Sequence, residues 1–167
     1  MLLRSDQTSP GVAMVMGKLT IPKFEKNQVG QVTATLSVTN HIDQILAERG
    51  FIEADAIRSI KLENVLVDTG ATLLSLPTEI IATLGLPVGG ETSVKTSAGS
   101  INTRIFREAN LEINGRRSTF DCLELTEVDI PLLGVLPMEA LGIEPDLQNQ
   151  CLRLLPMLGE NTYIYAM

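Results

Sequence analysis

A short polar motif stands inside an apolar run of this chain and limits its possible folds more than any other feature. Asp68-Thr69-Gly70 follows Val65-Leu66-Val67 and precedes a second apolar stretch at residues 71–76. Turns that only connect strands are usually flanked by polar residues. Gly70 permits a tight turn and a close approach of backbone to the carboxylate. The motif therefore predicts a partly desolvated carboxylate at the end of an interior strand, prepared for proton transfer.

The rest of the chain is patterned mainly for β-strands. Apolar and hydroxyl-bearing residues alternate over residues 32–39, which predicts a strand with one buried face. Residues 94–106 have the pattern of a hairpin that turns at residues 97–100. The pair Asn114-Gly115 is a strong signal for a second hairpin. Short strands joined by hairpins predict an all-β domain with one or two short helices.

Helices are expected where capping residues meet short apolar faces. Asn40 can cap a first helix, and a second is expected between Pro77 and Gly85. Residues 136–143 repeat the pattern of residues 76–86 in a form three residues shorter. As an internal repeat, this indicates two related halves, each with the order strand, glycine, strand, helix. A chance match between common residues is the alternative.

Composition removes several classes of function. The chain carries 13 Lys and Arg against 20 Asp and Glu, a net charge of −7, whereas nucleic-acid-binding surfaces are usually basic. One His and two Cys cannot supply a conventional zinc site, and no glycine-rich phosphate loop is present, so neither a metal nor a cofactor is expected. We expect Cys122 and Cys151 to be small core residues and His41 to have a surface or packing role.

The chain is expected to divide into a central domain with two short flanking segments. We assign residues 1–28 to a partly flexible extension, with an edge strand within residues 12–21, and residues 29–157 to the domain. Residues 158–167 are a tail or a closing strand. No run of 18 apolar residues suggests a membrane span, and two cysteines far apart in sequence favour the cytoplasm.

Two motifs together resemble those of the retropepsin-like aspartic proteases, including the bacterial members of that family. They are residues 65–72, which contain Asp68-Thr69-Gly70, and Leu132-Leu133-Gly134 with the helix that follows. The resemblance extends over roughly residues 30–156. It implies a single-lobe acid-protease fold, a closed β-barrel in which the aspartate loop forms the base of the active site. Leu132, Leu133 and Gly134 would support that loop through a ψ-shaped crossing of strands.

The resemblance also implies an aspartic endopeptidase that acts on a peptide or protein substrate. Two aspartates that share one proton can activate water and protonate the substrate, because like charges about 3 Å apart cannot both ionise. The chain has one Asp-Thr-Gly, so the site would need a homodimer in which each copy contributes Asp68. The implied catalytic residues are Asp68, Thr69 and Gly70. The implied substrate-binding residues are Ala71 and Thr72, with Ala98, Gly99 and Ser100 in a flap.

One departure from the family leaves part of this expectation open. Many retroviral enzymes have acidic residues soon after the motif, where this chain has Thr72 and Leu73, so the contacts made there to the substrate backbone stay undecided. A non-catalytic peptide-binding or dimerisation module with the same fold is the alternative function. A protein that removes its own residues 1–28 is a third possibility.

Overall fold

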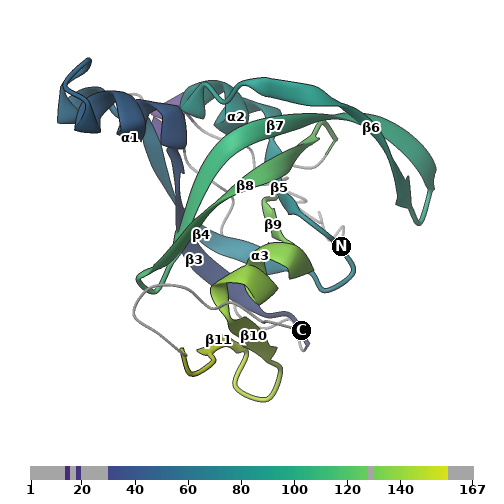
Figure 1. Cartoon of the computed structure of the whole chain (residues 1–167). Coiled ribbons are helices and arrows are strands. Elements are labelled where there is room, and N and C mark those ends of the chain that lie inside the picture. The colour runs from purple at the N-terminus through teal and green to yellow at the C-terminus, as the bar shows by residue number, and fades with distance from the viewer. Residues whose placement is uncertain (1–13, 16–17, 20–29, 128–129, 158–167) are drawn as a thin grey trace, which may run out of the picture.

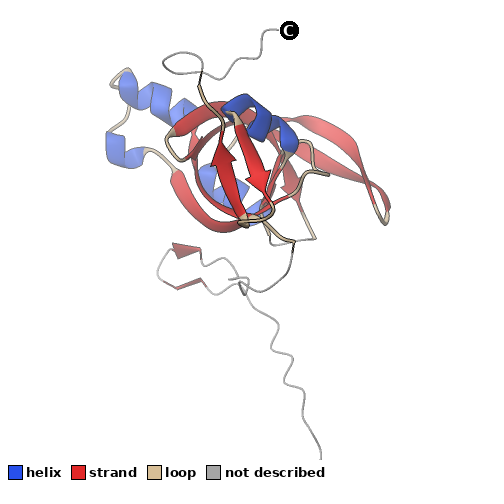
Figure 2. Cartoon of the chain, turned by 90° about the horizontal axis from the view of Figure 1, so that it is seen from below, coloured by secondary structure: helices blue, strands red, loops and turns tan. Residues whose placement is uncertain are grey.

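The computed structural model describes residues 14–15, 18–19, 30–127 and 130–157, and in this part of the chain seven strands share one sheet (Figure 1). They are β3 (Thr33–Asn40), β4 (Ser59–Val67), β5 (Leu74–Pro77), β6 (Val88–Thr96), β7 (Gly99–Ile113), β8 (Arg116–Leu125) and β9 (Leu132–Leu133). Their order is β3-β4-β9-β5-β8-β7-β6, and a further pairing of β3 with β7 closes six of them into a ring. Figure 2 shows this ring from below. The all-β fold expected from the sequence is confirmed.

The interior of the ring is filled by aliphatic side chains from alternate strand positions. On β3 the inward residues Ala34, Leu36 and Val38 are buried, and the residues between them are more exposed. Leu74 and Leu76 of β5 are fully buried. Alternation of this kind made it possible to predict the strands from the sequence, because one face of each strand packs on a common core.

Three α-helices and one 3₁₀ turn complete the described part of the chain, more than the one or two helices expected. They are α1 (His41–Glu48), η1 (Ala54–Ala56), α2 (Thr78–Leu84) and α3 (Val135–Leu141). Asn40 caps α1 as expected, because its Oδ1 accepts hydrogen bonds from the N–H groups of Ile42 (2.9 Å) and Asp43 (3.2 Å). Its Nδ2 also donates to the Leu84 carbonyl (2.9 Å), which ties α1 to the end of α2.

The two halves suggested by the repeat are only partly alike. Both α2 and α3 end at a glycine in the left-handed region, Gly85 with φ 61° and Gly142 with φ 60°. The first half has β5 between its glycine, Gly70, and its helix. In the second half Gly134 is itself the residue before α3, so the strand expected between glycine and helix is missing there.

Two short sheets form no strand pairing with the ring. One pairs β1 (Met14–Val15) with β2 (Lys18–Leu19), so these residues do not add the edge strand expected of residues 12–21. The other pairs β10 (Ile143–Asp146) with β11 (Cys151–Leu154). The rest of the expected N-terminal extension and the expected tail at residues 158–167 lie outside the described residues. The division into extension, domain and tail therefore stays a prediction.

The cysteine and histidine expectations have different outcomes. Cys122 is fully buried in the core as expected, and burial raises the pKa of its thiol to about 12. The expectation for Cys151 is wrong, because this residue is exposed, whereas its neighbour on β11, Leu152, packs against the core. His41 lies near the surface and forms a hydrogen bond with Glu108 (2.8 Å).

Within the described residues, no helix is long and apolar enough to cross a membrane.

Candidate active site

The Asp68 loop is a tight turn that the carboxylate itself helps to close. Asp68 follows β4 directly and is half-buried, whereas Thr69 and Gly70 are exposed. The carboxylate Oδ1 accepts a hydrogen bond from the Gly70 N–H (2.8 Å), and the Asp68 carbonyl accepts one from the Ala71 N–H (3.1 Å). A Cβ on Gly70 would lie 3.2 Å from that Oδ1, so the glycine allows the close approach that the sequence suggested.

Strand β9 passes beneath this loop, between β4 and β5. It pairs in parallel with β4, where Val67 lies opposite Leu133, and in an antiparallel direction with β5, where Ser75 lies opposite Leu132. The Asp68 N–H donates to the Leu133 carbonyl (3.0 Å). The crossing of strands implied by the resemblance is therefore present, and it fixes the main chain at the catalytic candidate.

The loop is held from its other side by the start of α3. The first N–H groups of a helix have no partner within the helix. Here the N–H groups of Val135 and Leu136 donate to the carbonyls of Ala71 (2.9 Å) and Thr72 (3.0 Å). Gly134 allows this docking, because a Cβ there would lie 2.4 Å from the Leu73 carbonyl oxygen. The loop is thus clamped between β9 and α3 by main-chain hydrogen bonds.

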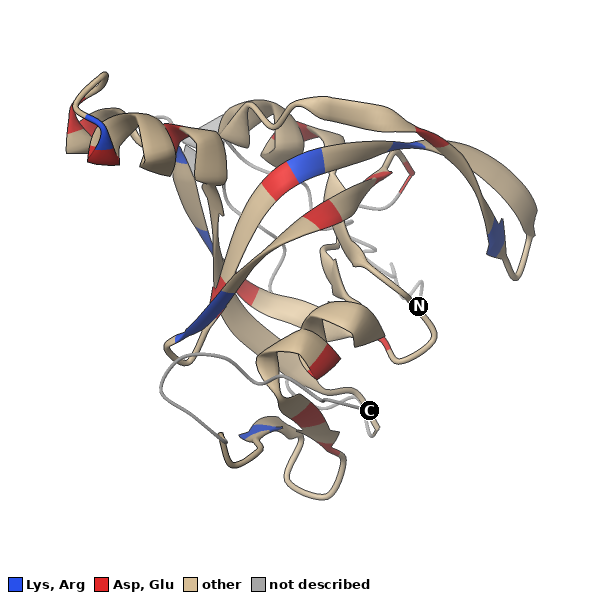
Figure 3. Ribbon diagram, viewed as in Figure 1, with Lys and Arg blue, Asp and Glu red and all other residues tan. Residues whose placement is uncertain are grey.

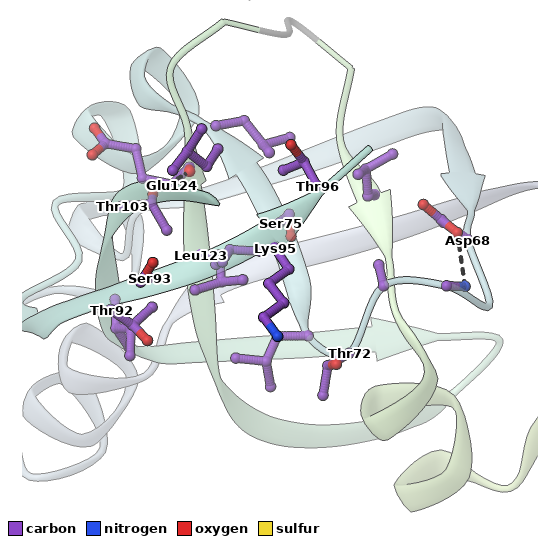
Figure 4. A pocket seen from close by; sticks show the side chains of 18 of the residues that line it. Asp68, Thr72, Ser75, Thr92, Ser93, Lys95, Thr96, Thr103, Leu123 and Glu124 are labelled. Atoms are coloured by element: carbon purple, nitrogen blue, oxygen red, sulfur yellow. Dashed lines mark hydrogen bonds between the residues drawn. The ribbon is translucent and has the colours of Figure 1, made fainter. Parts of the chain in front are cut away.

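A cleft of about 860 Å³ runs from this loop to the hairpin of β6 and β7 (Figure 4). Five of the residues named from the sequence line it, and they are Asp68, Gly70, Ala71, Thr72 and Leu132. Leu133 and Gly134 are buried and do not line the cleft. Thr69 and the three expected flap residues Ala98, Gly99 and Ser100 are also absent from the lining. The hairpin contributes Ile101 and residues 92–97 in their place.

The hairpin leaves the ring as a two-stranded ribbon that projects past it (Figure 1). Pairing of β7 with β8 begins at Ile105, opposite Leu123, so the part of β7 before that point pairs with β6 alone. The turn is closed by Thr96, whose hydroxyl donates to the Gly99 carbonyl (2.8 Å) and accepts from the Ala98 N–H (3.2 Å). The hairpin thus projects from the ring and lines the cleft through β6, and its role as a flap stays a prediction.

Two charged residues of the cleft, Lys95 and Glu124, were missed from the sequence. Glu124 is buried on β8, and its carboxylate accepts hydrogen bonds from Arg104 Nε (2.7 Å) and Nη2 (2.6 Å) and from the Thr78 hydroxyl (2.9 Å). The Arg104 guanidinium holds the pKa of the Glu124 carboxyl below its usual range, and Thr78 adds to this effect. A glutamate between Leu123 and Leu125 has the pattern of a solvent-facing strand position, so only the fold identifies its partner.

This ion pair predicts a specific dependence of stability on pH. A carboxyl whose pKa is lowered by folding stabilises the protein above its unfolded pKa, near 4.5, and loses that contribution as the pH falls through the folded value. We expect Glu124→Gln to lower the free energy of unfolding at pH 7 by about 1–2 kcal/mol, a modest value because the Arg104 side chain is 46% exposed and solvent screens the pair. Urea unfolding of both proteins should show this difference shrinking below pH 4.5. A difference that stays constant from pH 7 to pH 3 would contradict the assignment.

Comparison with known proteins adds one finding. A family model described as aspartyl protease matches residues 59–142, which is half of the chain. The match begins at the first residue of β4 and ends at the glycine that terminates α3, so it includes the Asp68 loop, the hairpin, β8 and the crossing strand β9. No curated protein matches the chain.

Proposed function

Because this chain belongs to the aspartyl protease family, we propose that it hydrolyses peptide bonds as an endopeptidase, at a site assembled from two copies of itself. One observation carries the proposal. The Asp68 carboxylate lies at one end of a cleft large enough for several residues of a peptide, on a loop that main-chain hydrogen bonds hold in place. Such fixed placement of a carboxylate is what proton transfer to and from a reacting group requires.

The chemistry of the proposed site follows from two Asp68 carboxylates that share one proton. The ionised carboxylate takes a proton from a water molecule, whose oxygen then forms a bond to the carbonyl carbon of the substrate. The protonated carboxyl gives its proton to the carbonyl oxygen, which yields a neutral tetrahedral intermediate. The carboxyl that took the proton from water then gives it to the amide nitrogen, and the other carboxylate, now ionised, takes a proton from one hydroxyl of the intermediate. The C–N bond breaks as that hydroxyl oxygen becomes a carbonyl again, the products leave as a carboxylic acid and an amine, and the two carboxyls again share one proton. In each copy the Gly70 N–H bond to Oδ1 orients the carboxylate.

The need for a second copy rests on the charges that line the cleft. A single carboxyl cannot act as acid and base in the same step, and the sequence has no second Asp-Thr-Gly. Among the described residues, the other carboxylate that lines the cleft is Glu124, which Arg104 holds in its ionised form through two hydrogen bonds. Glu124 is therefore a poor proton donor. A two-fold axis beside the Asp68 loop would supply the missing group as the Asp68 of the second copy.

The hairpin of β6 and β7 supplies a surface on which a peptide can bind as a strand. In the described sheet β6 is the terminal strand, so one of its edges has main-chain groups available for pairing. Residues 92–97 line the cleft, which supports a path for the substrate along this strand. Closure of the hairpin over a bound peptide would exclude water and order the substrate at Asp68.

Dilution tests the shared site directly. We expect wild-type protein to cleave members of a proteome-derived peptide library, and its activity per mole of chain to fall on dilution in step with the fraction of dimer. The dimer fraction is measured by sedimentation velocity on the same samples. Two copies joined by a flexible linker are the control, because their activity per mole should stay constant over the same range.

Two outcomes would contradict this proposal in different ways. Full activity per mole in samples that sediment as monomer would refute a site shared between copies. Binding of library peptides without cleavage, by the free and the linked protein alike, would refute the peptidase function. That second result would support the alternative of a peptide-binding module with an aspartyl protease fold.

A further inference from the structure

The charged side chains that line the cleft are not all paired. In the part of the chain that the structure describes they are Asp68, Lys95 and Glu124. Glu124 is bound by Arg104, whose side chain lies 2.6 Å from it. Neither Lys95 nor Asp68 takes part in an ion pair with any other described residue. Among the residues that the structure describes, the cleft therefore holds one cation, Lys95, that is free to meet a charge on the substrate.

The position of Lys95 is fixed by the hairpin. It lies opposite Ser100 in the pairing of β6 with β7, one residue pair from the turn that Thr96 and Gly99 close. In Figure 4 its side chain extends from β6 across the cleft toward the side where Thr72 lies. Thr72 follows the Asp68 motif and also lines the cleft. The ammonium group is thus carried from the hairpin toward the loop of the catalytic candidate.

The surroundings of Lys95 indicate which ligand it suits. The neighbouring cleft residues Thr72, Ser93 and Thr96 are neutral and bear hydroxyl groups, so none of them neutralises the ammonium. Figure 3 shows a blue band near the free end of the hairpin of β6 and β7, and Lys95 lies one residue pair from the turn of that hairpin, on a chain that carries a net charge of −7. Without Lys95, an acidic side chain of a substrate would be repelled by this excess of negative charge and by Asp68 itself.

We propose that Lys95 and Thr72 form a subsite for an Asp or Glu side chain of the substrate, an inference that rests on the proposed peptidase function. The ammonium would pair with the carboxylate of the substrate, and the Thr72 hydroxyl would offer it a hydrogen bond. A bound peptide displaces water from the cleft, which strengthens this attraction. In a two-fold dimer the second copy repeats the subsite, so acidic residues should be selected on both sides of the cleaved bond.

The test compares two peptides that differ only in having Glu or Gln at the selected position. A cleavage profile of the wild-type protein on the library locates that position. We expect kcat/KM to be about three- to fivefold higher for the Glu peptide, the scale of a partly exposed ion pair. The ratio should fall toward one as salt is added. Lys95→Met should bring the ratio to about one, and Lys95→Glu should reverse the preference toward a Lys-containing peptide.

Lys61→Met is the matched control. Lys61 is an exposed lysine on β4 that does not line the cleft, so this variant makes the same change in net charge. It should keep the wild-type Glu-to-Gln ratio. Urea midpoints of the three variants should equal that of the wild type, since both lysines are exposed.

Failure of this inference can be told apart from failure of the peptidase function. Cleavage that depends on Asp68, with the same Glu-to-Gln ratio in wild type and Lys95→Met, would overturn the subsite alone. If no peptide is cleaved, the peptidase function fails, and the subsite is then tested by fluorescence anisotropy of the same two peptides on the Asp68→Asn protein. Tighter binding of the Glu peptide that Lys95→Met removes would support the subsite. Equal binding of both peptides, or no binding, would overturn it.

Discussion

Replacing Asp68 with Asn is expected to lower kcat/KM for peptide cleavage by about 10³–10⁴-fold while the fold and the dimer remain. The amide of Asn has nearly the same shape as the carboxylate, and its oxygen can still accept the hydrogen bond from the Gly70 N–H. It cannot accept a proton from water at any pH at which the protein is folded. Peptide cleavage, followed by mass spectrometry of the products, measures the loss.

A matched change elsewhere separates loss of chemistry from loss of structure. Asp121 is an exposed aspartate on β8 that does not line the cleft, so Asp121→Asn should keep wild-type activity. The free energy of unfolding of Asp68→Asn, measured by urea, should stay within about 1 kcal/mol of the wild-type value, because Asp68 is half-buried and takes part in no ion pair among the described residues. Wild-type activity in Asp68→Asn would remove this residue from the mechanism.

Replacing Gly134 with Ala is expected to destabilise the protein by about 3 kcal/mol or more. The backbone at Gly134 has φ −85° and ψ 179°, which any residue can adopt, so the cost is not conformational. It comes from space, since the new Cβ would lie 2.4 Å from the Leu73 carbonyl oxygen and 2.7 Å from the Leu73 nitrogen. These are backbone atoms of the loop that carries Asp68, and they can move only if the loop separates from α3. Urea unfolding measures the loss.

Gly70→Ala provides the contrast. Its Cβ would meet a side-chain atom, Asp68 Oδ1, at 3.2 Å, and a small rotation of the carboxylate relieves that contact. We therefore expect a loss of stability below about 1 kcal/mol, together with a clear loss of cleavage because the carboxylate has turned. If Gly134→Ala unfolded at the same urea concentration as Gly70→Ala, the close packing of α3 on the loop would be refuted.

Local signals in the sequence predicted most of the elements. The alternation on β3, the cap at Asn40 and the turn at Asn114-Gly115 each depend on residues close together in the chain, and all three are confirmed. The Asp-Thr-Gly motif was recognisable for the same reason, because its three residues form one hydrogen-bonded turn.

Features that depend on contacts between residues far apart in the chain could not be predicted from the sequence. The partner of Glu124 is Arg104, 20 residues away on a neighbouring strand, and nothing in either local pattern joins them. Lys95 stands in an ordinary hairpin pattern, and only the fold of the hairpin brings it to the cleft. Cys151 has the pattern of a core residue, but Leu152 is the residue of β11 that packs against the core, which leaves Cys151 exposed.

The ribbon formed by β6 and β7 would link the entry of a peptide into the cleft to the selection of the charge on that peptide. Its root is pinned where the Thr103 hydroxyl donates to the Glu124 carbonyl (2.6 Å) and where Arg104 binds the Glu124 carboxylate. Beyond that root only the pairing of β6 with β7 holds the ribbon, so bending there breaks no hydrogen bond of the ring. Lys95 lies on this unsupported part. Under the proposed function, the element that would admit a peptide is thus the same one that would bind its acidic side chain, so a substrate would meet Lys95 before it is enclosed.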